Sequence, residues 1–289
     1  MIKQKNNNMS DEIEAHQFLS SWSINLNPDL KNKYEDSWLN NPQLGYFGFI
    51  PKESKALIIG TFPVLEQRTS GFFYHSDANL FWKILSFISN NKLETIDDKL
   101  SWLYKNKIGI TDILFEAERT DANHTSSSDI DLNPNAFNNI LKLLNDHTNI
   151  KDILLTSGGP MSKSLSGKSA GGWLGEHFRL ETKKNLKKIS NSGATLRVQI
   201  KKNDIEINLH YLFTPALQDS QLSLYLRKNL NVDQELSNIN FLKNISDKHF
   251  KYKILQWAVY FCKIENIVFA DISDEIIKYN LSKLLMENR

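Results

Sequence analysis

The sequence predicts an α/β protein of three layers, with helices on both faces of a short central, mostly parallel sheet. Three apolar runs of strand length, 55–60, 108–114 and 151–156, are each followed by turn-forming or polar residues. Segments with apolar residues at helical spacing lie between them. Strands that alternate with helices favour a parallel sheet, which binds ligands at the carboxyl ends of its strands.

The elements are expected in the following order. Residues 1–10 form a polar, Asn-rich tail that we expect to be disordered, and 11–54 form an ordered lead-in packed on the core. Residues 55–262 form the core, in which helical spacing predicts one helix near 79–90 and another near 134–146.

An insertion in this core is expected at 165–208, where glycines surround Trp173 and lysines flank two runs of strand character. We predict an inserted hairpin or long loop there, ahead of the last core strand at 209–213. The remainder of the chain is predicted to be helical, ending in an amphipathic helix within 263–289.

Composition narrows the class of protein. Hydrophobic residues make up 40% and charged residues 24%, as in ordinary soluble globular proteins. The net charge is 35 − 33 = +2, so a nucleic-acid surface would need local clustering of charge. Cys262 is the only cysteine, which excludes an internal disulfide framework and a Cys-rich zinc or iron–sulfur site.

The sequence also carries a prediction of location. No apolar segment is long enough to span a membrane, and residues 1–20 lack the apolar run of a signal peptide. The cytoplasm is therefore the expected location.

The most informative block joins the first core strand to the helix after it. Gly60-Thr61-Phe62-Pro63 ends the strand at a tight turn, Gly71-Phe72-Phe73-Tyr74 forms an aromatic loop, and Asn79 opens a helix that begins with Phe81-Trp82. An aromatic face, loop N–H groups and an amide side chain together suit a flat, polar ring. The block therefore predicts a pocket for a base.

This block resembles the first motif of mismatch-specific uracil-DNA glycosylases, roughly G-I-N-P-G…G-F-x-F-x-x-x-x-N-x-F-W-K, without a gap from Gly60 to Leu85. The catalytic Asn of that motif is replaced here by Phe62. The form Gly-Thr-Phe-Pro is closer to the hypoxanthine-DNA glycosylase branch of the uracil-DNA glycosylase superfamily. In that branch the Asn before Phe-Trp carries catalytic weight, and this is Asn79 here.

The resemblance implies roles for these residues. Tyr74 would stack on the flipped base, Asn79 would orient water or the base, and the loop N–H groups of Thr61 and Phe62 would face a base carbonyl. Phe62 would also exclude a water site used by Asn-bearing relatives, which predicts weak activity on uracil. The alternative for Asn79 is a helix cap, since Asn is among the best N-cap residues.

A second block, 110–114 with Glu118, Arg119 and Asp129, resembles the stretch W-D-V-L…E-R-x-x-S-x-D of the hypoxanthine branch. Asp112 is predicted to be a catalytic carboxylate, and Glu118 is a further candidate. Either would stabilise positive charge on the sugar or orient water. The alternative is an ion pair between Arg119 and a carboxylate that braces the loop.

Two later blocks extend the predicted site. Ser157 stands where the family often has an Asn-Gly strand end, and we expect it to bind the base. The segment 212–217 resembles the family's second motif, a loop that enters the minor groove. Thr214 would then hold a phosphate, and Leu217 or Gln218 would fill the gap left by the base. An ordinary strand-ending turn is the alternative.

A basic stretch supplies the predicted DNA-binding lysines, and a solvated loop is the alternative for it. Its members are Lys183, Lys184, Lys187 and Lys188.

Together these features predict a monomeric, monofunctional DNA glycosylase. It would hydrolyse the N-glycosidic bond of a deaminated or modified base and leave an abasic site, with DNA as its partner and no metal or redox cofactor. Two alternatives remain open: a glycosylase specialised for bulky modified bases of phage DNA, and a nucleic-acid-binding module that has lost the chemistry.

Overall fold

A computed structural model gives the fold of the 289-residue chain. The residues it describes are 13–15, 28–41, 46–63, 72–74, 76, 79–120, 128–157, 168, 170–177, 186–190, 193–200, 203–216, 220–228, 231–264 and 267–281.

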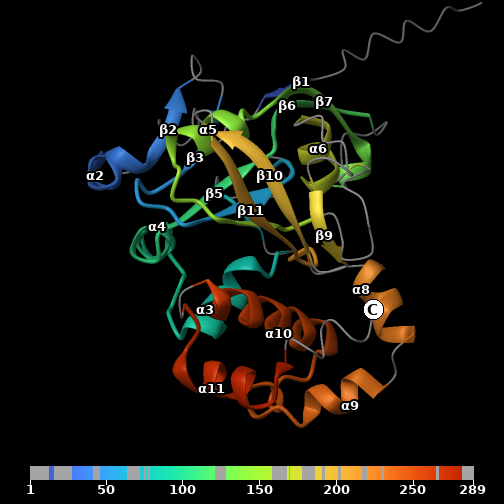
Figure 1. The fold of residues 1–289 in the computed structure, drawn as a ribbon. Helices are drawn as coiled ribbons and strands as arrows, with labels where there is room; N and C mark the ends of the chain where they lie inside the picture. Colours follow the sequence, from blue (N-terminus) through green and yellow to red (C-terminus); the bar gives the residue numbers. More distant parts are fainter. Residues whose placement is uncertain are drawn as a thin grey trace, which may run out of the picture.

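An eight-stranded sheet in the order β2-β3-β5-β4-β8-β11-β10-β9 runs through the middle of the molecule (Figure 1). Its four central strands are parallel: β5 (Ile108–Asp112), β4 (Ala56–Gly60), β8 (Asp152–Leu155) and β11 (Asn203–Tyr211). Gly60 pairs with Asp112, so the carboxyl ends of β4 and β5 lie level with one another.

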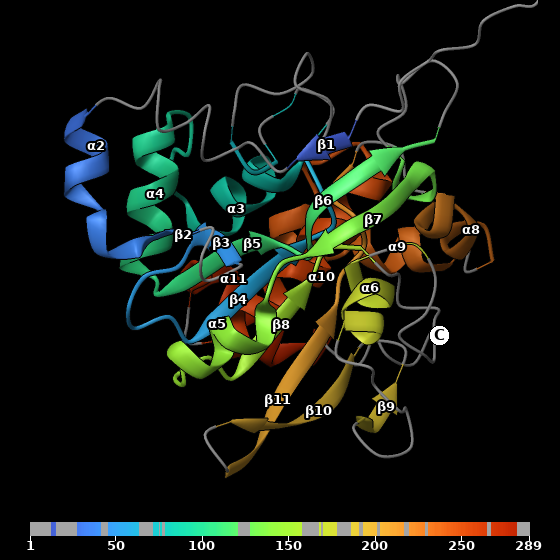
Figure 2. The same ribbon diagram turned by 90° about the horizontal axis from the view of Figure 1, so that it is seen from above.

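Antiparallel strands extend the sheet at both edges. One edge carries β2 (Trp38–Asn41) and β3 (Tyr46–Phe49). The other carries β10 (Gly193–Ile200) and β9 (Leu186–Ser190). The 165–208 segment thus adds strands to the main sheet, with β10 and β11 forming a hairpin (Figure 2).

Helices cover both faces of the sheet, because successive side chains of its central strands point to opposite sides. In β4, Ala56 and Ile58 pack into one apolar cluster, and Leu57 and Ile59 into the other. The first cluster includes residues of α3 (Phe81–Ser89), α4 (Ile96–Lys105), α10 (Lys248–Lys263) and α11 (Ala270–Lys278). The second includes residues of α5 (Ile140–Asp146) and α6 (Ala170–His177).

The predicted fold class, an α/β layer structure around central parallel strands, is confirmed. Helix ends follow local capping chemistry. Thr95 and Asp98 form a reciprocal capping box at the start of α4, and Asp247 accepts two backbone N–H bonds at the start of α10. The other described helices are α2 (Pro28–Lys33), α8 (Ser220–Lys228) and α9 (Asn231–Ser237).

The helix expected near 134–146 is shorter than predicted. A second, three-stranded sheet in the order β1-β6-β7 contains β1 (Ile13–Ala15), β6 (Leu114–Arg119) and β7 (Leu132–Phe137). β7 pairs with β6, so its backbone is extended and the helix begins only at Ile140. Pro134 is tolerated there because β7 is an edge strand.

None of the helices within the described ranges has the length and apolar character needed to cross a bilayer.

A candidate active site at the carboxyl ends of the central strands

Polar residues gather where β4, β5 and β8 end. Backbone pairing continues one step past the strands, since Leu114 N–H donates to Thr61 O (3.1 Å) and Thr156 N–H to Ile59 O (3.1 Å). Four polar residues therefore lie together at the carboxyl ends of the central strands, here called the strand edge: Thr61, Asp112, Thr156 and Ser157. This is the edge at which parallel sheets bind ligands.

Thr61, Ser157 and Asp129 form a hydrogen-bonded cluster at this edge. The Thr61 hydroxyl donates to Asp129 Oδ2 at 2.7 Å, and its oxygen lies 2.7 Å from Ser157 Oγ. Ser157 Oγ also accepts the N–H of Ala170, the first residue of α6, at 2.8 Å. The cluster therefore ties together the ends of two strands, a helix and the short 3₁₀ turn Asp129–Asp131.

The Asp129 carboxyl has an unusual environment. Burial raises its pKa from 3.8 to about 6, and the negative charge of Asp112 acts in the same direction. The hydrogen bonds from Thr61 and Ser157 and the charge of Arg119 lower this pKa in part. The result is a carboxyl that changes its charge close to neutral pH.

Tyr74 reaches the same edge from the aromatic loop. Its hydroxyl lies 2.8 Å from Thr156 Oγ1, and its ring stacks on Phe81 with centroids 4.2 Å apart and planes 9° from parallel. Burial, together with the charge of Asp112, holds its pKa well above 10, so the hydroxyl stays neutral. The backbone of Tyr74 has φ = +56°, a left-handed conformation that is uncommon for a bulky residue and is found at functional sites.

Gly60 makes this close approach possible. A Cβ at this position would overlap the Asp112 carboxylate and the Tyr74 hydroxyl. Only glycine lets both groups lie directly against the end of β4. This is the physical reason for a glycine at the first position of the motif.

The turn after Gly60 is braced by Arg119. This side chain is 2% exposed, and its Nη2 donates to Pro63 O at 2.8 Å. Its guanidinium lies 5.9 Å from the centre of the Phe62 ring, which is half-buried and packs on the second apolar cluster. Arg119 thus supports the turn through a carbonyl and a ring, and it lowers the pKa of Asp129 through its charge.

Asn79 lies beside the loop of the last core strand. It forms an antiparallel bridge with Ala216, and the N–H of its neighbour Leu80 donates to Pro215 O at 2.7 Å. Its Oδ1 accepts the N–H of Phe81 at 2.9 Å. Leu80 holds the N-cap position of α3, so Asn79 supports the start of the helix from one residue ahead of the cap, and it also joins the segment before α3 to the loop after β11.

α10 packs against the loop after β11, where that loop meets Asn79. The buried Lys253 donates its Nζ to Ala216 O at 2.5 Å, and Gln256 Oε1 accepts the N–H of Phe213 at 2.8 Å. Trp257 is fully buried and meets Phe81 edge to face at 5.2 Å, so it belongs to the core. Polar side chains of one helix thus hold the backbone of the 213–216 loop.

The remaining predicted residues are placed as follows. Thr214 is half-buried in the loop after β11, and its Oγ1 accepts the N–H of Ala216 at 3.4 Å. Glu118 lies in β6, paired with Ile13 and Asn133. Outside the described residues lie Leu217, Gln218, Lys183 and Lys184, and the described part of β9 contains the backbone but not the side chains of Lys187 and Lys188.

Two residues of this edge had no role assigned from the sequence. Asp129 stood in a motif, but a long polar segment separates it from Arg119 and hides which strand end it meets. Thr156 directly precedes Ser157, and its position at a strand end was the available signal. Across the described residues, no three His, Cys, Asp or Glu side chains are arranged as a metal site.

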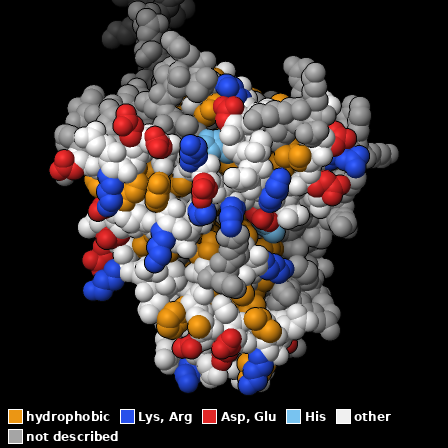
Figure 3. Space-filling view, turned by 60° about the vertical axis from the view of Figure 1, so that its left-hand side comes forward, with side chains coloured by type: hydrophobic (Ala, Val, Ile, Leu, Met, Phe, Trp, Pro, Cys, Tyr) orange, Lys and Arg blue, Asp and Glu red, His pale blue; other side chains and the backbone are white. Residues whose placement is uncertain are grey.

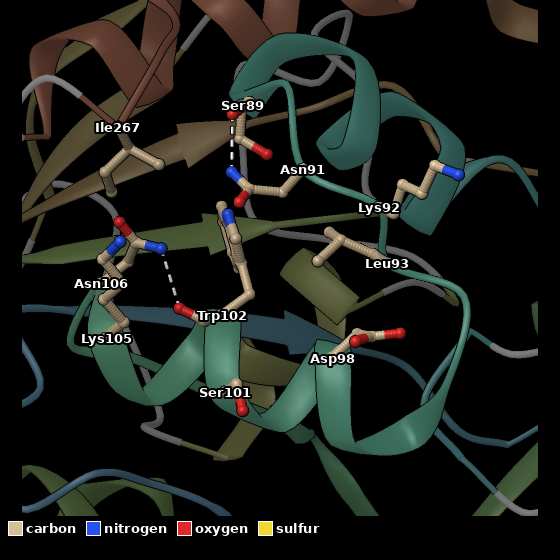
Figure 4. Close-up of a pocket in the computed structure, with 10 residues that line it drawn as sticks. All are labelled: Ser89, Asn91, Lys92, Leu93, Asp98, Ser101, Trp102, Lys105, Asn106 and Ile267. Carbon is tan, nitrogen blue, oxygen red and sulfur yellow. Dashed lines mark hydrogen bonds between the residues drawn. The ribbon is translucent and has the colours of Figure 1, made fainter.

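A separate pocket of about 230 Å³ lies between the C-terminal end of α3 and one side of α4 (Figure 4). Trp102 and Ile267 line it, and the amides of Asn91 and Asn106 that point into it donate to the carbonyls of Ser89 and Trp102. None of the strand-end residues lines this pocket.

Comparison with known proteins gives few matches. No family model matches the chain, and no curated protein matches it. Among solved structures, one similar chain is a solution NMR structure described as a putative uracil DNA glycosylase from Methanosarcina acetivorans. It shares 15% identity with this chain at a TM-score of 0.42, covering 76% of this chain and 97% of its own.

Proposed function

We propose that this protein is a monofunctional DNA glycosylase, which extrudes a modified base from DNA and hydrolyses its N-glycosidic bond. The observation that carries the proposal is the meeting of two loops at the strand edge. Asn79 bridges Ala216 and accepts the N–H of Phe81, on which Tyr74 stacks, so the segment that follows β4 and the loop from β11 converge near Tyr74. A flipped nucleotide needs such a convergence of a stacking ring, polar groups and a DNA-facing loop.

The base would be held by the first loop. One face of the Tyr74 ring is covered by Phe81, so the base would stack on the other face. Stacking of a base on an aromatic ring contributes about 1–3 kcal/mol, which offsets part of the cost of extrusion. The N–H groups of Thr61 and Phe62 would meet a carbonyl of the base, where negative charge develops as the bond breaks.

The bond would be cleaved by water. The water oxygen bonds to C1′ of the sugar, and the electron pair of the glycosidic bond leaves with the base. Asp112, which is 5% exposed, would stabilise the positive charge that builds up on the sugar. Asn79 would orient the water or the base, and Thr214 would contact a phosphate.

Phe62 bears on the substrate. An apolar ring cannot hydrogen-bond the water that an amide would hold at this position. We therefore expect weak activity on uracil and better activity on a larger or differently substituted base.

The test is a panel of duplex and single-stranded oligonucleotides carrying uracil, hypoxanthine, xanthine, or hydroxymethylated or glucosylated cytosine. After incubation, alkali cleaves the strand at abasic sites. We expect alkali-dependent cleavage at one or more modified bases, and none in the matched unmodified strand. DNA that is bound but keeps every base would contradict the proposal and favour a binding module.

A further inference from the structure

We propose that Asp129 is the general base of this site and that Thr61 and Ser157 are its positioning residues. The inference rests on the glycosylase function proposed above. It assigns the attacking water to a carboxylate that no sequence motif identified as catalytic.

The direction of the hydrogen bonds supports this role. A hydroxyl has one proton to donate, and Thr61 gives its proton to Asp129 Oδ2. Ser157 receives the N–H of Ala170 on its oxygen, so its own proton is directed to Thr61 or to the carboxylate. The Thr61 hydroxyl donates to Asp129, and the Ser157 hydroxyl donates to Asp129 or to Thr61. Asp129 therefore acts as an acceptor in this cluster, as an ionised carboxylate does.

The surrounding charges suit a base. Asp112 on β5 adds a like charge, Arg119 on β6 adds an opposite charge, and Tyr74 contributes a neutral phenol. Burial raises the pKa of Asp129 to about 6 against the hydrogen bonds from Thr61 and Ser157, which lower it, and the charges of Asp112 and Arg119 make smaller, opposite contributions. A general base is most effective when its pKa lies near the working pH, because it is then ionised and still holds a proton well.

Asp112 and Asp129 can thus have different roles in the reaction. Asp112 lies against Gly60 and would stabilise the positive charge on the sugar. Asp129 takes the proton of the water as the water oxygen bonds to C1′ and the glycosidic electron pair leaves with the base. The proton then passes from Asp129 to the departing base or to solvent, which returns the carboxylate to its starting state.

The test is the pH dependence of base excision under single-turnover conditions, with the modified strand that the wild type cleaves best. We expect the wild-type rate to rise with pH to a plateau, with a midpoint close to the Asp129 pKa of about 6. Asp129→Asn should lower the plateau by at least about 100-fold and remove this pH dependence. Asp131→Asn makes the same change of charge in the same 3₁₀ turn, and should keep both the rate and the midpoint.

A second pair of variants tests the positioning role. The Thr61 hydrogen bond lowers the pKa of Asp129, so Thr61→Val should move the midpoint to higher pH, whereas Thr61→Ser keeps the hydroxyl and should leave it in place. The inference is overturned if Asp129→Asn excises at the wild-type rate, or if the wild-type rate falls as the pH rises through about 6. A wild type that releases no base at any pH overturns the glycosylase function itself, so the two failures are distinct.

Discussion

At the residue scale, the side chains at the strand edge combine a structural contact with a proposed chemical role. Asn79 accepts a backbone N–H at the start of α3 and bridges Ala216. Tyr74 stacks on Phe81 and lies against Gly60. Substitutions at such residues change stability and activity together, so each prediction needs a variant that separates the two.

For Asn79, two variants separate capping from chemistry. Asn79→Ser keeps a side-chain oxygen that can accept the N–H of Phe81 at the start of α3 but removes the amide, and Asn79→Ala removes both. We expect Asn79→Ser to fold like the wild type and to excise the base at least about tenfold more slowly, a loss of about 1.4 kcal/mol of transition-state stabilisation. Single-turnover rates and thermal unfolding measure the two effects. A folded Asn79→Ser protein with wild-type excision would leave Asn79 with the capping role alone.

For Asp129, we expect the ionised carboxylate that catalysis needs to lower the stability of the folded protein. Its pKa in the folded protein is raised from 3.8 to about 6, so between these values the folded protein binds more protons than the unfolded chain. Stability is therefore lost as the pH rises from about 4 to 6, and the penalty is complete above that range. Asp129→Asn keeps an oxygen that can accept the Thr61 bond and removes the penalty.

We expect Asp129→Asn to raise the free energy of unfolding at pH 7 by on the order of 1–3 kcal/mol and to change it little near pH 4. Urea denaturation at the two pH values measures the difference, with Asp131→Asn as the control. An Asp129→Asn protein that is less stable than the wild type at pH 7 would show that the charged carboxylate does not destabilise the fold.

At the element scale, α10 connects the apolar core to the site. Gln256 is fully buried and accepts the N–H of Phe213, while Lys253 donates to Ala216 O. Gln256→Leu deprives the Phe213 N–H of this acceptor, and we expect it to lower the free energy of unfolding by about 1–3 kcal/mol. Denaturation with urea, with the exposed Gln199→Leu as control, measures this loss. Equal stability of the two variants would mean that the hydrogen bond from Phe213 to Gln256 does not stabilise the fold.

Some secondary-structure elements could be predicted from the sequence and others could not. The central strands and α3 were predictable, because contiguous apolar runs and one gapless motif define them. The second sheet was not, because β6 takes its partners from β1 and β7, which are remote from it in sequence or separated by a polar loop. For the same reason the motif containing Asp129 gave no indication that this side chain meets Thr61 and Ser157.

At the scale of the whole molecule, the net charge is small, with 35 basic and 33 acidic residues. Basic and acidic side chains are interspersed, with apolar ones between them, on the face shown in Figure 3. With a net charge of +2, affinity for DNA must depend on local groups. The edge strand β9 carries Lys187 and Lys188, and Lys183 and Lys184 precede it in the sequence.

We predict that these four lysines contact phosphates. Their replacement by Gln should weaken binding to all duplex sequences and reduce the slope of log affinity against log salt concentration by roughly 0.9 for each lost contact. The control replaces four exposed lysines of the helical part: Lys105, Lys243, Lys248 and Lys278. Affinities measured at several salt concentrations give the slopes. Equal slopes in the wild type and in the variant with the four lysines replaced would show that these lysines lie in a solvated segment and do not contact phosphates.

The most direct test of the account as a whole is a mass balance of the reaction. The wild type is incubated with the modified oligonucleotides, and the free base and the strand are quantified by mass spectrometry without alkali. The account predicts free base and abasic strand in equal amounts, an unbroken backbone, and slower release by Asn79→Ser and Asp129→Asn. Intact DNA recovered from a wild-type complex for every modified base would contradict it.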